Sequence, residues 1–179
     1  MRVLLLGATG TIGQATAQAL VQHGHQVICP VRTPGRANST LQSSAWTQRL
    51  RDAEVRVLPV GAPLQIDAAA LERDRIDAIV SCLASRTGTP ADAWRVDYEL
   101  HAALLQQATL ANVAHFILLS AICVQKPLLS FQQAKLAFER ALMESGLRYS
   151  IVRPTAFFKS LSGQVARVQA GRPYLLFGD

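Results

Sequence analysis

The amino-acid sequence predicts an α/β domain with a doubly wound parallel sheet. Short runs of Val, Ile and Leu recur along the 179 residues, and helix-like amphipathic segments separate most of them. Strands that are apolar at nearly every position are typical of a parallel sheet covered by helices on both faces. Alternating strands and helices favour right-handed crossovers, which produce a doubly wound order. The length suits one domain with its own core and is too short for two full-sized ones.

The expected elements follow from these runs in chain order. Strands are predicted at Arg2–Leu6, Gln26–Val31, Val55–Val60, Ala78–Leu83, His115–Ser120 and Tyr149–Arg153. Helices are predicted at Ile12–His23, Leu41–Asp52, Ala93–Ala111, Leu129–Glu144 and Phe158–Ala170. Gly24 and Gly146 follow two of these helices, where a left-handed residue commonly closes the helix. Thr33–Ser44 is predicted as a loop, and Pro173–Phe177 as a further strand.

Composition narrows the classes of protein. Half of the residues are hydrophobic and 17% are charged, which indicates a globular chain. The net charge of +6 suits nucleic acid, an anionic membrane surface or acidic small ligands. Because the basic residues are dispersed and no aromatic residues alternate with them, we do not expect nucleic-acid binding. No targeting segment is recognised and no apolar run is long enough to span a bilayer, so we expect a soluble or, at most, peripherally attached protein.

The three cysteines, Cys29, Cys82 and Cys123, lie far apart in apolar stretches. Their positions provide no metal-ligand spacing, and no metal site is expected. We predict that all three are small buried residues of a protein in a reducing compartment.

A glycine turn joins the first predicted strand to the first predicted helix. Gly7 allows a tight turn, Gly10 lets the backbone approach a pyrophosphate, and Gly13 permits close packing of helix on strand. The helix N-terminus and its dipole then favour phosphate groups. The turn predicts an NAD(P)-binding Rossmann fold, in which Thr9, Thr11 and Ile12 complete the phosphate-binding segment. A glycine turn without a ligand is the alternative.

The end of the second strand bears on the choice of dinucleotide. An NAD site places a carboxylate there, to accept a hydrogen bond from the ribose 2′-hydroxyl. The segment 29–33 has no acid and places Arg32 at that position, where a guanidinium can pair with a 2′-phosphate. We therefore predict NADPH as the cofactor. The alternative is that Arg32 is a solvated surface residue.

The Gly-x-x-Gly-x-x-Gly spacing resembles the extended and atypical branches of the short-chain dehydrogenase/reductase superfamily. That resemblance implies a Ser-Tyr-Lys set, with Tyr and Lys four residues apart on one helix face. Here Lys135 is present, but Phe131 replaces the tyrosine, and Ser120 closes the fifth predicted strand. Because Phe131 cannot donate a proton, reduction of an ordinary ketone is disfavoured. We expect Lys135 to hold the nicotinamide ribose hydroxyls; an exposed helix lysine is the alternative.

Longer strings carry a more specific resemblance. Residues 81–88, 92–98, 115–129 and 149–161 are similar to the divinyl chlorophyllide a 8-vinyl-reductase family. The resemblance implies an oxidoreductase of chlorophyll biosynthesis that uses NADPH to reduce the 8-vinyl group of a tetrapyrrole to ethyl. A vinyl group conjugated to the macrocycle can accept hydride with the charge spread over the ring, so a dedicated tyrosine is not obligatory.

Further site residues are assigned on this basis. Pro154 and Thr155 are expected beside the nicotinamide amide, and Phe157 and Phe158 against the flat ring of the substrate. Core aromatics are the alternative for the two phenylalanines. The third strand ends without the acid that relatives use toward adenine, so the cofactor is expected to contact the segment formed by Leu83, Ala84 and Ser85.

Members of the family are considerably longer than this chain. We predict an NADP(H)-binding Rossmann domain at 1–157 and the start of a truncated substrate-binding region at 158–179, in a chain that binds cofactor but reduces little. The expected location is the cytoplasm or the thylakoid periphery of a photosynthetic bacterium, and the oligomeric state is left open. A non-catalytic NADPH-binding regulator or photosystem assembly factor is the alternative that shares the glycine turn and the absent tyrosine. An isoflavone-reductase-like enzyme acting on a phenolic substrate is a third possibility, which shares the lone lysine but not the longer strings.

Overall fold

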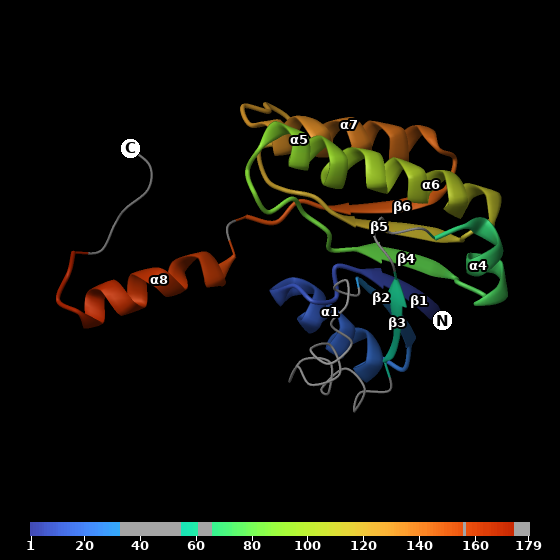
Figure 1. Ribbon diagram of the computed structural model, residues 1–179, viewed down its shortest axis with the longest axis horizontal. Coiled ribbons are helices and arrows are strands. Elements are labelled where there is room, and N and C mark those ends of the chain that lie inside the picture. The colour runs from blue at the N-terminus through green and yellow to red at the C-terminus, as the bar shows by residue number, and fades with distance from the viewer. Residues whose placement is uncertain (33–54, 61–65, 156, 174–179) are drawn as a thin grey trace.

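The computed structural model describes residues 1–32, 55–60, 66–155 and 157–173. Within these residues the chain forms a six-stranded parallel sheet in the order β3-β2-β1-β4-β5-β6, which confirms the predicted doubly wound Rossmann fold. Helix α1 lies on one face of the sheet, and α4, α6 and α7 lie on the other (Figure 1). The strand order reverses between β1 and β4, which is where doubly wound folds bind their ligands.

The six strands follow the apolar runs of the sequence. They are β1 (Arg2–Leu6), β2 (Gln26–Arg32), β3 (Arg56–Val60), β4 (Ala78–Ser81), β5 (His115–Leu119) and β6 (Arg148–Val152). Alternate residues of β1 face opposite sides of the sheet. Leu4 and Leu6 pack with Phe116 and Phe138 on one face, whereas Leu5 packs with residues near α1 on the other.

The helices are α1 (Thr11–Gln22), α4 (Ala68–Arg73), α5 (Pro90–Ala93), α6 (Leu100–Leu110), α7 (Ser130–Glu144) and α8 (Phe158–Gln169), with a π-helical turn η1 (Trp94–Glu99) between α5 and α6. The single helix predicted over 93–111 is therefore three consecutive segments that begin three residues earlier. Helix α4 was not predicted, because six residues show too little periodicity. It is capped by Asp67, whose carboxylate accepts a hydrogen bond from the Ala70 N–H at 2.7 Å.

The remaining differences are small shifts at element ends. Strand β4 ends at Ser81, two residues before the predicted end, so Leu83 lies in the loop that follows. The left-handed positions predicted for Gly24 and Gly146 are confirmed by φ angles of +76° and +79°. The predicted helix 41–52 and loop 33–44 fall outside the described residues, as does most of the strand predicted at 173–177.

The cysteines fulfil their prediction only in part. Cys29 is buried on β2, and burial raises the pKa of its thiol to about 12. Cys82 is half-buried. Cys123 is exposed and has a φ of +67°, so the prediction of burial is wrong at this position. The apolar run continues past the end of β5, but there the chain leaves the sheet and turns through a surface loop.

Helix α8 extends away from the sheet (Figure 1). Its apolar residues Val165 and Val168 are accordingly exposed. The domain division predicted at 157/158 falls at the start of this helix and stays a prediction. Among the described residues, none of the helices combines the length and apolar character needed to cross a membrane.

Candidate functional site

The glycine turn after β1 is built so tightly that two of its glycines cannot carry a side chain. Gly7 has a φ of +74°, and a Cβ atom there would lie 2.7 Å from the Cys82 carbonyl oxygen. A Cβ atom on Gly13 would lie 2.1 Å from the carbonyl oxygen of Gly7. Both glycines therefore let α1 approach the ends of β1 and β4 closely.

Gly10 has a different environment from the other two glycines. It is the N-cap of α1, and its N–H donates to the Gly7 carbonyl at 2.9 Å. The nearest atom to a Cβ built there is the Gly7 carbonyl oxygen at 3.3 Å, a close contact but less severe than those at Gly7 and Gly13. Thr9 and Thr11 on either side are exposed, and Ile12 is half-buried.

The start of α1 fits an anionic group. The first backbone N–H groups of a helix have no partner within the helix, and the helix dipole favours negative charge there. The first turn of α1 contains no acidic residue that would repel phosphate. With the small residues of the preceding turn, this arrangement fits the pyrophosphate of a dinucleotide.

The carboxyl ends of the parallel strands bring the other predicted residues to the same edge. Backbone hydrogen bonds continue beyond the strands: the Cys82 N–H donates to Leu6 at 3.0 Å and the Ser120 N–H to Val152 at 2.8 Å. Leu83, Ala84 and Ser85 follow β4 directly, and Pro154 and Thr155 follow β6. Arg32 ends β2 at this edge, paired with Val60, although its side chain lies outside the described part.

Lys135 lies on α7 and is buried, which contradicts the alternative of an exposed helix lysine. Its Nζ atom lies 3.1 Å from Oδ1 of Asp97 in η1 and donates to the Leu119 carbonyl at 3.4 Å. The neighbouring Ser120 is also buried, and its Oγ has no hydrogen-bond partner within the described residues. Phe131, one turn before Lys135, is half-buried and provides no polar group. Lys135 and Ser120 therefore lie near each other at the carboxyl end of β5, Lys135 through its contact with the Leu119 carbonyl and Ser120 as the next residue.

His101 is a buried residue beside the end of β4, and sequence reasoning missed it because no motif marks it. Nδ1 of His101 lies 2.7 Å from the Val96 carbonyl, so Nδ1 carries the proton and donates it. Nε2 then accepts from the Ser81 hydroxyl at 2.7 Å. Burial, and secondly the charge of Lys135, lower the pKa of His101 to about 4. The ring is therefore neutral near pH 7 and joins the end of β4 to the start of α6.

The loop after β4 is held by Asp92. Its carboxylate accepts hydrogen bonds from the backbone N–H groups of Arg86 and Thr87 at 2.9 and 3.0 Å. These bonds, the one from Thr87 foremost, hold the pKa of Asp92 well below its usual range. Residues 83–85, which the sequence assigns to cofactor contact, are thereby anchored at their C-terminal end, where Arg86 and Thr87 follow.

A second ion pair fixes the end of β6. Glu139 is fully buried on α7, one turn after Lys135, and pairs with the guanidinium of Arg153. Nε of Arg153 donates to Oε1 of Glu139 at 3.1 Å. This pair sets the direction in which the chain leaves the sheet toward Pro154 and Thr155.

The two phenylalanines assigned to the substrate lie farther along the chain. Phe157 is 37% exposed, which leaves its ring accessible. Phe158 begins α8, and its side chain lies outside the described part. Their contact with a substrate stays a prediction.

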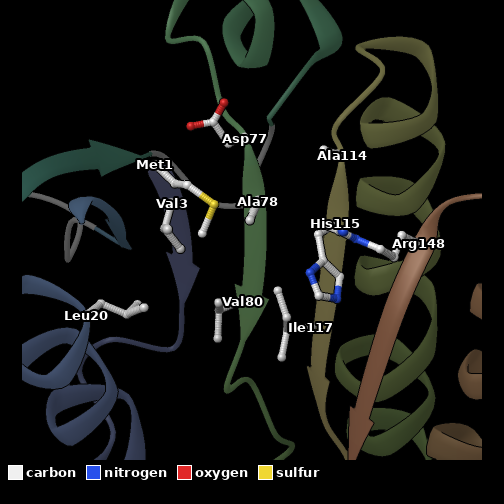
Figure 2. Close-up of a pocket in the computed structure, with 10 residues that line it drawn as sticks. All are labelled: Met1, Val3, Leu20, Asp77, Ala78, Val80, Ala114, His115, Ile117 and Arg148. Atoms are coloured by element: carbon white, nitrogen blue, oxygen red, sulfur yellow. The ribbon is translucent and has the colours of Figure 1, made fainter. Parts of the chain in front are cut away.

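A cavity of about 420 Å³ lies elsewhere in the molecule (Figure 2). Met1, Asp77, Ala114 and Arg148, which line it, precede or begin strands β1, β4, β5 and β6. The cavity therefore lies toward the amino ends of the strands, whereas dinucleotides bind at the carboxyl ends. We do not assign the cofactor to it.

The fold, the glycine turn and the residues gathered at the carboxyl ends of the strands define a dinucleotide-binding protein. The sequence pattern of the NAD(P)H-binding family matches residues 7–175, and the chain belongs to that family. It is 45% identical over 183 residues to divinyl chlorophyllide a 8-vinyl-reductase of Cucumis sativus, which confirms the resemblance seen in the sequence. That match covers 99% of this chain and 44% of the cucumber protein, so the chain spans less than half the length of the relative.

Two more distant similarities complete the comparison. The photosystem II assembly factor Ycf39 of Cyanophora paradoxa is 29% identical, with 93% of this chain and 49% of that protein covered. The structure of UDP-glucuronic acid 4-epimerase from Bacillus cereus in complex with NAD superimposes with a TM-score of 0.77 at 20% identity. It covers all of this chain and 66% of the epimerase chain, and it supports the fold alone.

Proposed function

We propose that this chain is the NADPH-binding part of an enzyme that reduces the 8-vinyl group of divinyl chlorophyllide a to ethyl. The observation that carries the proposal is the 45% identity to a divinyl chlorophyllide a 8-vinyl-reductase over nearly the whole chain. The site supports it, because the glycine turn, a buried lysine and a serine hydroxyl that has no hydrogen-bond partner among the described residues all lie at the carboxyl edge of the sheet, where dinucleotides bind.

The preference for NADPH rests on the end of β2. Arg32 is the last residue of that strand, where NAD-binding members of this fold carry a carboxylate. A carboxylate would repel a 2′-phosphate, whereas a guanidinium can pair with it in a bidentate manner. The net charge of +6 adds a favourable field for a ligand with several phosphate charges.

The residues of the chain would bind and orient the reactants. The glycine turn would hold the pyrophosphate, Lys135 the nicotinamide ribose hydroxyls, and Pro154 with Thr155 the amide. NADPH, when bound, supplies the hydride, which adds to one vinyl carbon while a proton adds to the other. Phe131 cannot donate that proton, so solvent or another weak acid must. The main contribution of the protein is then alignment of nicotinamide and vinyl group.

The substrate would lie against the segment that leaves β6. The exposed ring of Phe157 offers a flat apolar surface of the kind that stacks on a tetrapyrrole. A lipophilic substrate and a basic surface also favour contact with the periphery of an anionic membrane. Cosedimentation with phosphatidylglycerol vesicles, but not with phosphatidylcholine vesicles, is the expected result, and lack of binding to both would contradict membrane contact.

A chimera tests the function, because the chain matches less than half of its relative. In the cucumber reductase, the matched segment is replaced by this chain, and the product is incubated with divinyl chlorophyllide a and NADPH. The Soret band is expected to shift to that of the monovinyl product, and Lys135→Met is expected to abolish the shift. A chimera that binds NADPH but leaves the vinyl group intact would overturn the proposal.

A non-catalytic role is the second candidate, favoured by the 29% identity to an assembly factor that matches almost the whole chain. The same chimera separates the two. NADPH binding without reduction, together with retention of photosystem II subunits on the immobilised chain, would support the assembly role. Reduction of the vinyl group would exclude a purely non-catalytic one.

A further inference from the structure

The turn η1 interrupts an otherwise α-helical segment with π-helical geometry. It spans Trp94–Glu99, between α5 and α6, and Asp97 is its only buried residue. π-Helical turns are rare and frequently lie at functional sites. This turn is held in place by His101, whose Nδ1 donates to the Val96 carbonyl at 2.7 Å. The hydrogen bond from His101 therefore stabilises the π-helical geometry, and this geometry places the carboxylate of Asp97 in the protein interior.

Asp97 joins two groups of the candidate cofactor site. Its side chain is fully buried, and Oδ1 lies 3.1 Å from Nζ of Lys135. Both carboxylate oxygens also accept from the Ser85 N–H at 3.4 Å, in the loop after β4. Asp97 thus links η1 to α7 on one side and to the β4 loop on the other.

Within the part of the chain that the structure describes, the Lys135 ammonium has two acceptors for its three donors. These acceptors are the carboxylate of Asp97 and the carbonyl of Leu119. Leu119 is the last residue of β5 and precedes Ser120, whose buried Oγ has no partner in the described part of the chain. A ligand atom that reached this point would meet the third donor of Lys135 and the hydroxyl of Ser120 together.

We propose that Asp97 is a positioning residue that holds the Lys135 ammonium toward the nicotinamide ribose, and that η1 exists to bring it there. This inference rests on the proposed function, in which Lys135 binds that ribose. A purely structural ion pair is the competing explanation. Buried pairs add little net stability, because desolvation of the two charges offsets their attraction. If the only role of η1 were to form such an ion pair, the pair would add little to the stability of the fold.

The test compares two ligands that share the 2′-phosphorylated adenosine half of NADPH. NADPH contains the nicotinamide ribose, whereas adenosine 2′,5′-bisphosphate contains only the adenine ribose and its 2′-phosphate. Asp97→Asn keeps an oxygen for the Ser85 N–H and removes the charge beside Lys135. It is expected to raise the Kd of NADPH roughly tenfold to a hundredfold. The Kd of the bisphosphate is expected to stay within about twofold of its value in the unmodified chain.

A double variant shows whether Asp97 acts through Lys135. If it does, Lys135→Met with Asp97→Asn weakens NADPH binding no more than Lys135→Met alone. Asp97→Glu, which keeps the charge one methylene farther out, provides a second measure should Asp97→Asn not fold. It is expected to show a smaller loss, again confined to NADPH. Glu99→Gln changes an exposed carboxylate of the same turn and is the control that should leave both affinities unchanged.

The outcomes separate this inference from the proposed function. Equal losses for both ligands, fully additive losses in the double variant, or unchanged NADPH binding in Asp97→Asn would overturn the positioning role. If the unmodified chain binds the bisphosphate but gains nothing from the nicotinamide half, the placement of Lys135 is wrong. If it binds neither ligand, the proposed function itself fails.

Discussion

Gly10 and Gly13 lie three residues apart in the same turn, but a methyl group would meet different surroundings at each. At Gly13 a Cβ atom would overlap the Gly7 carbonyl, and at Gly10 it would approach only one atom, at 3.3 Å. We expect Gly13→Ala to destabilise the protein by about 1–3 kcal/mol or more through overpacking. Gly10→Ala should cost less stability than Gly13→Ala, although alanine is a poorer N-cap than glycine, and it should weaken NADPH binding because the methyl group would occupy the space of the pyrophosphate. Urea denaturation and fluorescence titration measure the two effects. Equal effects of both variants on stability would contradict the assignment.

Arg32 is assigned to the 2′-phosphate from its position at the end of β2. Replacement by aspartate reverses the charge and supplies the carboxylate typical of NAD sites. Arg32→Asp should weaken NADPH binding by on the order of 1–3 kcal/mol, while NADH binding stays nearly constant or improves. Isothermal titration with both cofactors measures the difference. An equal loss for NADPH and NADH would refute the role in 2′-phosphate recognition.

At the scale of elements, His101 makes the join between β4 and α6 sensitive to pH. Its folded pKa of about 4 lies below the value of 6.5 for an unperturbed histidine. Between these values the unfolded chain binds more protons than the folded chain, so stability falls as pH falls from about 6.5 to about 4 and levels off below. The loss attributable to His101 is at most roughly 3–4 kcal/mol, from the difference between its folded and unfolded pKa values.

The variant His101→Asn isolates this contribution. An asparagine amide can still donate to the Val96 carbonyl, but it does not titrate. We expect the variant to be less stable than the unmodified chain at pH 7.5 and to lose less stability on acidification. Urea denaturation at pH 7.5 and 4.5 measures both, and the comparison cancels groups common to both proteins, including His115. The same loss on acidification in both proteins would show that His101 does not control this dependence.

The elements also show how far the sequence predicts this fold. Strands β1 to β6 were found because each is a local apolar run, and α1 because its glycine turn precedes it. Helix α4 was missed because its stability comes from Asp67 and from packing of Leu71, not from periodicity. The turn η1 was missed because its backbone is set by contacts made after folding, such as that of His101 with Val96.

The residues of the candidate site likewise include some that local sequence predicts and others that only the folded structure brings together. The glycine turn and Arg32 are local features and could be proposed from spacing alone. The partner of Lys135 could not, because Asp97 lies in a different element and the two meet only through packing of η1 against α7. The pair of Glu139 with Arg153 is likewise formed between elements.

At the scale of the whole molecule, the predicted ligand groups are gathered at one edge of the sheet. They come from β1, β2, β4, β5, β6 and α7, which are separate in the chain. A ligand that spans this edge contacts the folded arrangement and not the unfolded chain, so binding must stabilise the fold. This holds whether or not the chain catalyses a reaction by itself.

NADPH should therefore raise the melting temperature of the chain. At a concentration one hundred times its Kd it adds about 2.7 kcal/mol, which corresponds to a shift of roughly 5–10 °C for a domain of this size. NADH at the same concentration should give a smaller shift, and Gly10→Ala should reduce the shift with NADPH measured from that variant's own melting temperature without ligand. Scanning fluorimetry over a series of concentrations provides the measurement. Equal shifts with NADH and NADPH would contradict recognition of the 2′-phosphate, and no shift with either would contradict a dinucleotide site at this edge.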